Sequence, residues 1–375
     1  MAVQEDSEAP MFYTHGVAAY PGFAVTEKHN DNILRSDANK QSSLITVLSP
    51  SVLVQGKSGA NVYSLTYNAD IGRYASSSAD NFEDQNLSGV AELSFSTRAS
   101  AKIAPMYQIG HDDRGAFYSP LTATPNTWHK SGIGGSFTYG SDESIGRIVL
   151  EASTYDIRYQ NNREITTAFD RSLDDVAGSF YYRAAPKVFT FVQLGDTRIA
   201  YRDSASPLSG HEERAMVGAT WNATAQTTGS FKIGQLRKKF DSSQMQTFTG
   251  SSWEGKMRWS PVEFARLDLV SSRRTYETTG IGSFVLNTYN GLDFGYDVSQ
   301  RTTVHVTASR LTEEFGQTDR VDTTPAFGLK GEYKLRKWLK MGAEYARAVK
   351  SSTGFTGTSP EYHQNIFAVN IHSEL

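Results

Sequence analysis

The feature that most constrains this 375-residue chain is an alternation of apolar and polar residues, with a period of two, along nearly its whole length. In residues 367–372, Phe, Val and Ile alternate with Ala, Asn and His. Residues 62–71 do the same, with Tyr63, Leu65 and Tyr67 on one face. A strand with one apolar face has this pattern, whereas the 3.6-residue period of an amphipathic helix is nearly absent. The sequence therefore predicts an all-β fold.

The alternating segments follow one another without a change of character, which indicates one domain. Eighteen can be counted, at residues 21–29, 43–55, 60–73, 84–97, 101–111, 127–140, 145–160, 172–184, 187–202, 211–224, 228–240, 247–259, 263–276, 281–297, 301–313, 324–336, 338–350 and 362–375. The count falls to 16 if the two weakest, 21–29 and 101–111, are not strands. We expect an N-terminal tail over residues 1–20 and one β-domain over residues 21–375.

The connections between these segments alternate in length. Short turns at 55–59, 97–100 and 140–143 are each followed by a longer polar loop, as at 112–126 and 160–171. An up-and-down antiparallel meander places all short turns on one rim and all long loops on the other. Transmembrane outer-membrane barrels have this layout, with short periplasmic turns. An even strand count then predicts that both termini are periplasmic.

Composition removes several other classes of protein. No run of 18 apolar residues exists, so no helix is predicted to span a bilayer. The net charge of −3 argues against a nucleic-acid partner, and the lack of cysteine excludes disulfides and thiol catalysis. Residues 1–6 show no signal-peptide pattern, which fits either a cytoplasmic protein or a mature exported chain with an added initiator Met.

Aromatic residues, 12% of the chain, gather near the ends of the predicted strands. A membrane barrel places such rings at the two membrane interfaces, whereas a soluble β-sandwich has no reason to sort them to strand ends. The girdle predicted at the short-turn rim consists of Tyr63, Phe95, Tyr139, Tyr182, Phe231, Trp259, Tyr296 and Tyr333. The outward-facing rings predicted at the long-loop rim are Trp128, Tyr159, Tyr201, Phe248 and Tyr345.

The opposite faces are predicted to line a lumen of mixed charge. Such a lumen suits a hydrated solute rather than a hydrocarbon, although most of the charges are expected to pair along the wall. Tyr181 and Tyr289 are candidates for stacking on sugar rings, and the loop 112–126 for folding inward as a gate. The lumen-lining candidates are Glu151, Asp156, Arg158, Asp175, Tyr181, Arg183, Asp196, Arg198, Arg202, Glu212, Arg214, Lys232, Glu254, Lys256, Arg258, Arg266, Asp268, Tyr289, Asp293, Lys330, Glu332, Lys340 and Glu344.

Signals of catalysis are weak. The charged cluster at 111–115 starts a long loop, where such clusters are usually solvated, and the glycines at 132–135 lie within a strand and open no helix. We therefore expect no enzyme activity, no cofactor and no metal. Five basic residues near the long-loop rim could instead pair with lipid A phosphates, or form a solvated rim. They are Arg237, Lys238, Lys239, Arg273 and Arg274.

Local motifs in the first third of the chain add a family resemblance. Residues 22–35, the stretch Leu-Ser-Pro-Ser-Val at 48–52 and the segment 107–115 resemble the putative β-barrel porin 2 family. That resemblance implies an outer-membrane barrel of an exopolysaccharide or capsule secretion system. Such barrels are thought to work beside a periplasmic export protein and an inner-membrane polymerase and co-polymerase. The chain departs from the usual barrel signal by ending in Leu375 rather than an aromatic residue.

Together, pattern and resemblance predict a conduit in the outer membrane of a Gram-negative bacterium that exports a polysaccharide, as in biofilm formation. The expected partners are lipopolysaccharide, the polysaccharide and a periplasmic export protein. A general or sugar-uptake porin is the main alternative, and a structural or adhesive barrel without transport is the second.

Overall fold

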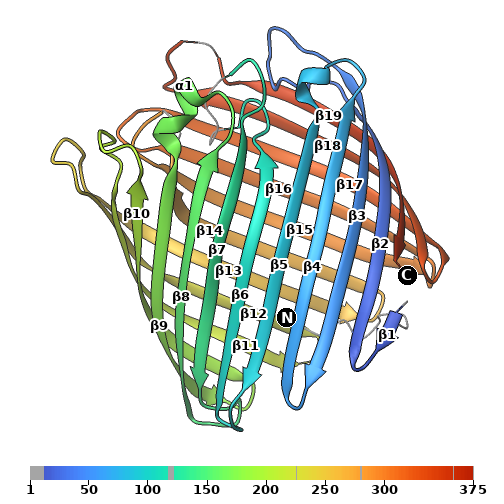
Figure 1. Ribbon diagram of the computed structural model, residues 1–375, viewed down its shortest axis with the longest axis vertical. Helices are drawn as coiled ribbons and strands as arrows, with labels where there is room; N and C mark the ends of the chain where they lie inside the picture. Colours follow the sequence, from blue (N-terminus) through green and yellow to red (C-terminus); the bar gives the residue numbers. More distant parts are fainter. Residues whose placement is uncertain (1–11, 117–121, 225, 279–280, 358, 375) are drawn as a thin grey trace.

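The computed structural model describes residues 12–374 except 117–121, 225, 279–280 and 358, and it forms a single closed barrel (Figure 1). Its strands are β1 (Phe12–Thr14), β2 (Val17–Asn30), β3 (Ser43–Ser58), β4 (Asn61–Tyr74), β5 (Phe82–Ser94), β6 (Ala99–His111), β7 (Thr127–Tyr139), β8 (Gly146–Tyr159), β9 (Arg171–Ala185), β10 (Val188–Tyr201), β11 (Gly210–Thr224), β12 (Thr227–Phe240), β13 (Phe248–Val262), β14 (Ala265–Tyr276), β15 (Val285–Ser299), β16 (Thr302–Phe315), β17 (Val321–Arg336), β18 (Leu339–Thr353) and β19 (Tyr362–Glu374). Three short helical turns lie in the loops: η1 (Ser78–Asp80), α1 (Arg163–Thr166) and η2 (Thr167–Phe169).

Each strand from β2 to β19 pairs antiparallel with its neighbours in the chain, and β19 pairs with β2 to close the barrel. The prediction of an 18-stranded antiparallel barrel is confirmed. The two weakest segments are the real strands β2 and β6. β1 lies outside the count, because it only folds back on the start of β2. β2 begins at Val17, within the stretch expected to be a tail.

The connections sort to two rims. On one rim the strands are joined by tight turns, such as Gly59–Ala60 between β3 and β4, and on the other by longer loops that carry α1, η1 and η2. Figure 1 shows the long-loop rim at the top. β2 starts and β19 ends at the short-turn rim. Among the described residues, no helix is long and apolar enough to cross a membrane.

The two faces of the wall are inverted relative to a water-soluble β-protein. On β10, the outward-facing Leu194 is 67% exposed, whereas Phe191 and Ile199 on the inner face are buried. The same holds on β19, where the outward-facing Phe367 is 63% exposed. An outer face of exposed apolar side chains requires an apolar solvent, as in the lipid-facing band of a membrane barrel.

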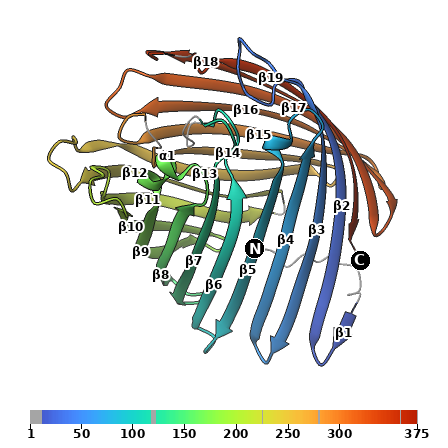
Figure 2. The same ribbon diagram turned by 45° about the horizontal axis from the view of Figure 1, so that its top comes forward.

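Two segments at the long-loop rim fold into the barrel. The β13–β14 ladder runs only from Val262↔Ala265 to Trp253↔Arg273, so residues 274–276 of β14 leave β13 and bend inward with β15. Phe284, Val285 and Leu286 beyond them are buried. We call residues 274–286, of which 279–280 lie outside the described residues, the inner tip (Figure 2).

The loop before β3 is the second inward segment. Its Ile33 packs on Ile45 and Val47 of the inner face, and the buried Asn32 side chain donates to the His363 carbonyl oxygen at 2.9 Å. The lumen is therefore narrowed on two sides at this end.

Candidate solute pathway in the lumen

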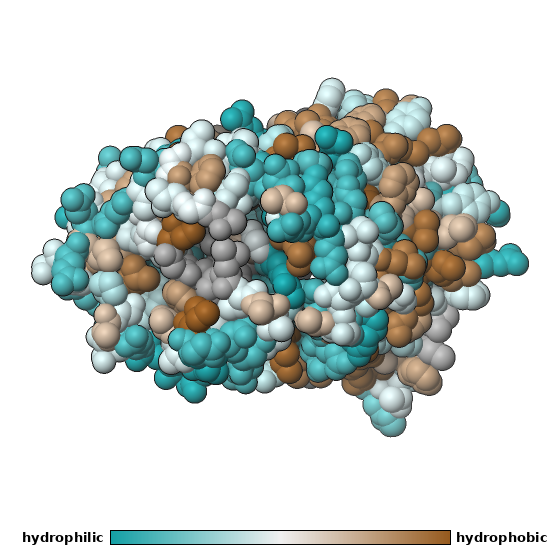
Figure 3. Space-filling model, turned by 90° about the horizontal axis from the view of Figure 1, so that it is seen from above, coloured by the Kyte–Doolittle hydropathy of each residue, from teal (hydrophilic) through white to brown (hydrophobic). Residues whose placement is uncertain are grey.

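Beside the inner tip lies a cavity of about 720 Å³, which we call the lumenal chamber. Two facing parts of the wall form it, β6–β9 on one side and β14–β16 with the inner tip on the other. Figure 3 looks onto this end and shows hydrophilic side chains over the rim and apolar side chains on one flank. The lining residues are Gln108, Asp112, Trp128, Lys130, Ile157, Tyr159, Arg171, Val270, Ser272, Arg274, Tyr276, Glu277, Asn287, Tyr289 and Leu311.

Aromatic rings are held on both sides of the chamber. The indole of Trp128 lies over Gly110, where a β-carbon would meet the ring at 2.7 Å, so glycine is what lets the ring lie flat on the wall. Its Nε1 donates to Asp112 Oδ1 at 2.8 Å, which fixes the ring. On the facing wall, Tyr289 lies over Gly291 in the same way. A β-carbon at position 291 would lie only 2.6 Å from the Tyr289 hydroxyl oxygen.

Three cations face the chamber. Lys130 lies over the Tyr155 ring at 4.0 Å, and Arg274 over the Tyr276 ring at 4.9 Å. The Arg171 guanidinium donates to the Phe169 carbonyl oxygen at 2.9 Å, but its buried Nε has no hydrogen-bond partner among the described residues. Lys130 and Arg274 rest on rings and form no ion pair among the described residues, so their charge is available to a solute, whereas the Arg171 charge also interacts with Glu277.

The two carboxylates that line the chamber, Asp112 and Glu277, are hydrogen-bonded, Asp112 through its Oδ1 to Trp128. Glu277 accepts a hydrogen bond from the buried Lys238 Nζ at 2.5 Å and another from the Tyr201 hydroxyl at 3.3 Å. Thr275, at the base of the inner tip, bonds the Glu212 carboxylate. These contacts attach the inner tip to β10, β11 and β12.

A second cavity of about 440 Å³ continues the pathway toward the short-turn rim. It shares Val270, Ser272 and Arg274 with the chamber. Its other lumenal side chains mix both charge signs with aromatic and amide groups: Glu151, Tyr181, Phe191, Gln193, Lys232, Glu254 and Lys256. Lys232 and Glu254 pair at 3.3 Å, so this stretch is closer to electrical balance.

The ladder register places most of the predicted lumenal residues on the inner face, but five face outward. On β8, the inward-facing Glu151 and the outward-facing Asp156 are five residues apart and cannot share a face of an unbroken strand. The same error affects β10, whose inner face carries Phe191 and Ile199. The prediction is therefore wrong for Asp156, Arg158, Asp196, Arg198 and Arg202, which lie on the outer face near the long loops.

These five residues are charged and yet outward-facing because they lie beyond the apolar band. Asp156 pairs with Arg158 and Arg202 there, and Asp196 pairs with His211 at 3.1 Å. All other predicted lumenal residues, including Tyr181 and Tyr289, lie on the inner face. Several pair along the wall, as Arg258 does with Asp268 at 2.6 Å.

The eight rings predicted at the short-turn rim are all outward-facing and exposed. The prediction for the long-loop rim is wrong for Trp128, Tyr159, Tyr201 and Phe248, because each lies on the inner face of its strand. Only Tyr345 faces outward there, against Phe367. Tyr159 is eight residues from Glu151, so the even spacing could have placed it in the lumen. Lys130, Arg171 and Glu277 of the chamber were missed entirely.

Two of the five predicted lipid A contacts lie inside the barrel. Lys238 is buried under the inner tip and Arg274 lines the chamber, so neither can reach a lipid. The other three lie on the outer face, where Lys239 pairs with Glu213 and Arg273 pairs with Glu314 at 3.2 Å. Arg237 is exposed there.

The remaining sequence motifs pack within the rim. His111 bonds Asp84 at 2.9 Å and stacks on Phe82. In the loop 112–126, Asp113 pairs with Arg35 and Arg114 with Asp80 of neighbouring loops, while residues 117–121 lie outside the described residues. The segments that fold into the barrel are the inner tip and the loop before β3, and of the described part of the loop 112–126 Asp112 lines the chamber.

Comparisons with known proteins agree on the fold. A family model described as putative beta-barrel porin 2 matches residues 17–374. The chain is similar to OpdK of Pseudomonas aeruginosa crystallised with vanillate (TM-score 0.51, 10% identity, 95% of this chain and 99% of that chain). It is also similar to OccK2 (OpdF) of the same organism (0.52, 10%, 95% and 98%) and OccAB2 of Acinetobacter baumannii (0.50, 13%, 96% and 98%). No curated protein matches the sequence. At such identities the structural likeness concerns the barrel alone.

Proposed function

Because this chain belongs to the putative β-barrel porin 2 family, it is an outer-membrane porin barrel, and we propose that its lumen carries a secreted polysaccharide across the outer membrane. The long loops then face the exterior and the short turns, with both ends of the barrel, face the periplasm. A periplasmic export protein would meet the barrel at that rim. No step in this role requires chemistry, so the barrel acts as a channel.

The observation that carries the proposal is the pairing of rings with available cations along the lumenal chamber. Flat rings such as Trp128 and Tyr289 offer faces to successive sugar units. Lys130 and Arg274 form no ion pair with a carboxylate among the described residues, and Arg171 faces the same space. A sugar chain that carries carboxylates satisfies both sets of groups, and its many weak contacts allow it to slide.

Deletion of the gene in the native bacterium tests this role. We expect the polymer to accumulate in the periplasm and to be secreted again when the wild-type chain is restored. A double variant, Trp128→Ala with Arg274→Ala, should restore secretion only in part, whereas Arg198→Ala on the outer face should restore it fully. Unchanged secretion in the deletion strain would contradict the proposal.

A second candidate is a diffusion channel for small aromatic carboxylates. The same rings and cations favour it, and OpdK, whose fold is similar, was crystallised with vanillate. Under this alternative, the deletion strain secretes its polymer normally but grows slowly on low concentrations of such carboxylates. The growth assay therefore separates the two functions in one strain.

A further inference from the structure

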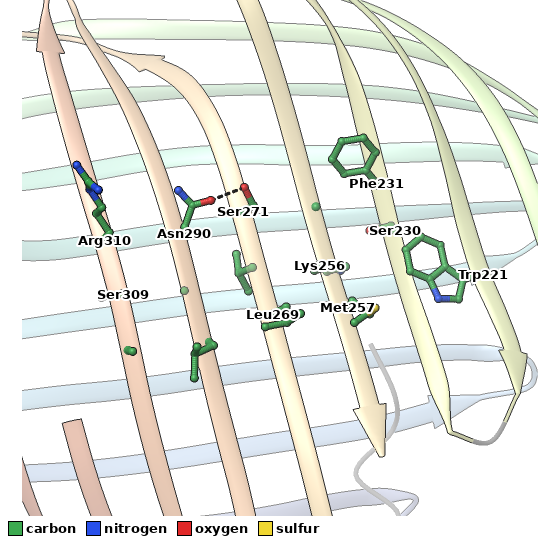
Figure 4. Close-up of a pocket in the computed structure, with 15 residues that line it drawn as sticks. Trp221, Ser230, Phe231, Lys256, Met257, Leu269, Ser271, Asn290, Ser309 and Arg310 are labelled. Carbon is green, nitrogen blue, oxygen red and sulfur yellow. Dashed lines mark hydrogen bonds between the residues drawn. The ribbon is translucent and has the colours of Figure 1, made fainter. Parts of the chain in front are cut away.

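The outer face of the barrel carries a concave groove across β11–β16, with a volume of about 540 Å³ (Figure 4). Its floor and sides are apolar. Outward-facing Phe231, Met257 and Leu269 lie on it, with Leu292 and Ala308 beside them in the register of the next strands. The groove is a shallow, open hollow on a face that contacts lipid.

One end of the groove is polar. Ser271 donates to Asn290 Oδ1 at 2.8 Å and accepts from Trp253 Nε1 at 2.9 Å. Arg310 lies next to Asn290 in the β15–β16 register and is exposed. No acidic side chain among the described residues forms an ion pair with it. Figure 4 shows Arg310, Asn290 and Ser271 toward one end and Trp221 at the other.

The polar end lies at the edge of the apolar band. Counting outward-facing residues on β16 from the short turn, Val304, Val306 and Ala308 are apolar and Arg310 is the first charge. The groove thus runs from the apolar band toward the long-loop rim and ends at the guanidinium of Arg310. A molecule that fits has an alkyl part and an anionic head, and a guanidinium beside an amide is suited to phosphate.

We propose that this groove binds one molecule of lipid A, with an acyl chain along Leu269 and Leu292 and a phosphate at Arg310. The site is distinct from the basic residues at 237–239 and 273–274, and it lies outside the lumen. The choice of lipid A rests on the proposed orientation, in which the long loops face the exterior leaflet. A bound lipid would fill the concave part of the wall.

Native mass spectrometry of the full chain in mild detergent, incubated with lipid A or with phosphatidylglycerol, tests the site. We expect one lipid A retained per barrel, and at least about tenfold less retention for Arg310→Gln, since a charge-assisted contact is lost. Arg198→Gln is the matched control, because Arg198 is also an outward-facing arginine near the long-loop rim, on β10. Equal loss in both variants overturns the proposal, as does a preference for phosphatidylglycerol.

A second pair of variants tests the apolar part without touching the charge. Ala308→Phe should fill the groove and lower lipid A retention, whereas Ala343→Phe, outward-facing on β18 and outside the groove, should not. A dimer of the chain in place of the lipid complex would overturn the proposal. Arg310→Gln should leave the channel conductance unchanged, so failure of the lipid site and failure of the transport role give different results.

Discussion

Aromatic residues at the two ends of the strands have opposite roles in this barrel. At the short-turn end, rings such as Tyr182 and Trp259 face outward and are exposed. At the long-loop end, Trp128, Tyr159 and Tyr201 face inward and narrow the lumen. The residue types are the same, so composition does not separate them. What separates them is their position in the alternation of the strand. A ring an even number of positions away from a residue of known orientation lies on the same face as that residue, and a ring an odd number away lies on the opposite face.

The comparison requires that the outer face of the wall contacts lipid and the inner face contacts water. Substitutions at two adjacent residues of β10, one on each face, should give the largest difference. Leu194→Arg should lower the free energy of unfolding by about 2–4 kcal/mol, because it places a charge in the lipid-facing band. Gln193→Arg, one residue away on the inner face, should change it by less than about 1 kcal/mol. Urea unfolding in lipid vesicles, followed by tryptophan fluorescence, measures both. Equal losses would show that the two faces have been assigned incorrectly.

Replacing one tryptophan by alanine at each end of the barrel tests whether the two ends differ in function. Trp128→Ala should weaken block of the ionic current by an acidic oligosaccharide about tenfold, because one stacking face, worth roughly 1.4 kcal/mol, is lost. Trp259→Ala should leave the block within about twofold of the wild type, since its indole lies outside the lumen. Single-channel recording in planar bilayers gives both dissociation constants. If Trp259→Ala weakened the block as much, the chamber would not be the binding site.

The smallest expected effect concerns charge rather than rings. Arg274→Ala should lower the anion-to-cation permeability ratio about two- to threefold, because a cation is removed from the narrow part of the lumen. Arg198→Ala removes the same charge from the outer face and should leave the ratio unchanged. Reversal potentials in a salt gradient measure the ratio. An equal change in both variants would indicate a general surface-charge effect.

The barrel could be predicted from the sequence because strand alternation and turn length are local properties. The two weakest segments of the pattern are the strands β2 and β6, and each carries a proline, Pro21 and Pro105. Both strands nevertheless pair with a neighbour on each side. The hydrogen bonds of these two ladders stabilise the strand even where its own alternation is weak.

The chamber could not be predicted in the same way. It depends on the inner tip, which is held by contacts such as Lys238–Glu277, 39 residues apart in the chain. The alternation of apolar and polar residues does not show which residues distant in the chain come into contact. The faces of Asp156 and Arg158 could have been assigned by counting from Glu151, but their charge suggested the lumen instead. Charge identifies an inner face only within the apolar band, because beyond it both faces contact water.

The seam between β19 and β2 has a consequence for assembly. It joins residues at the two ends of the chain, from Ile366↔Asn30 to Glu374↔Gly22. Until the last strand has been made and delivered, the sheet has two unpaired edges, each a template for pairing with another chain. Ring closure of such high contact order is expected to be slow. The newly exported chain therefore needs protection from aggregation for as long as both edges are unpaired. A chain truncated before β19 could not close the barrel and would stay prone to aggregation.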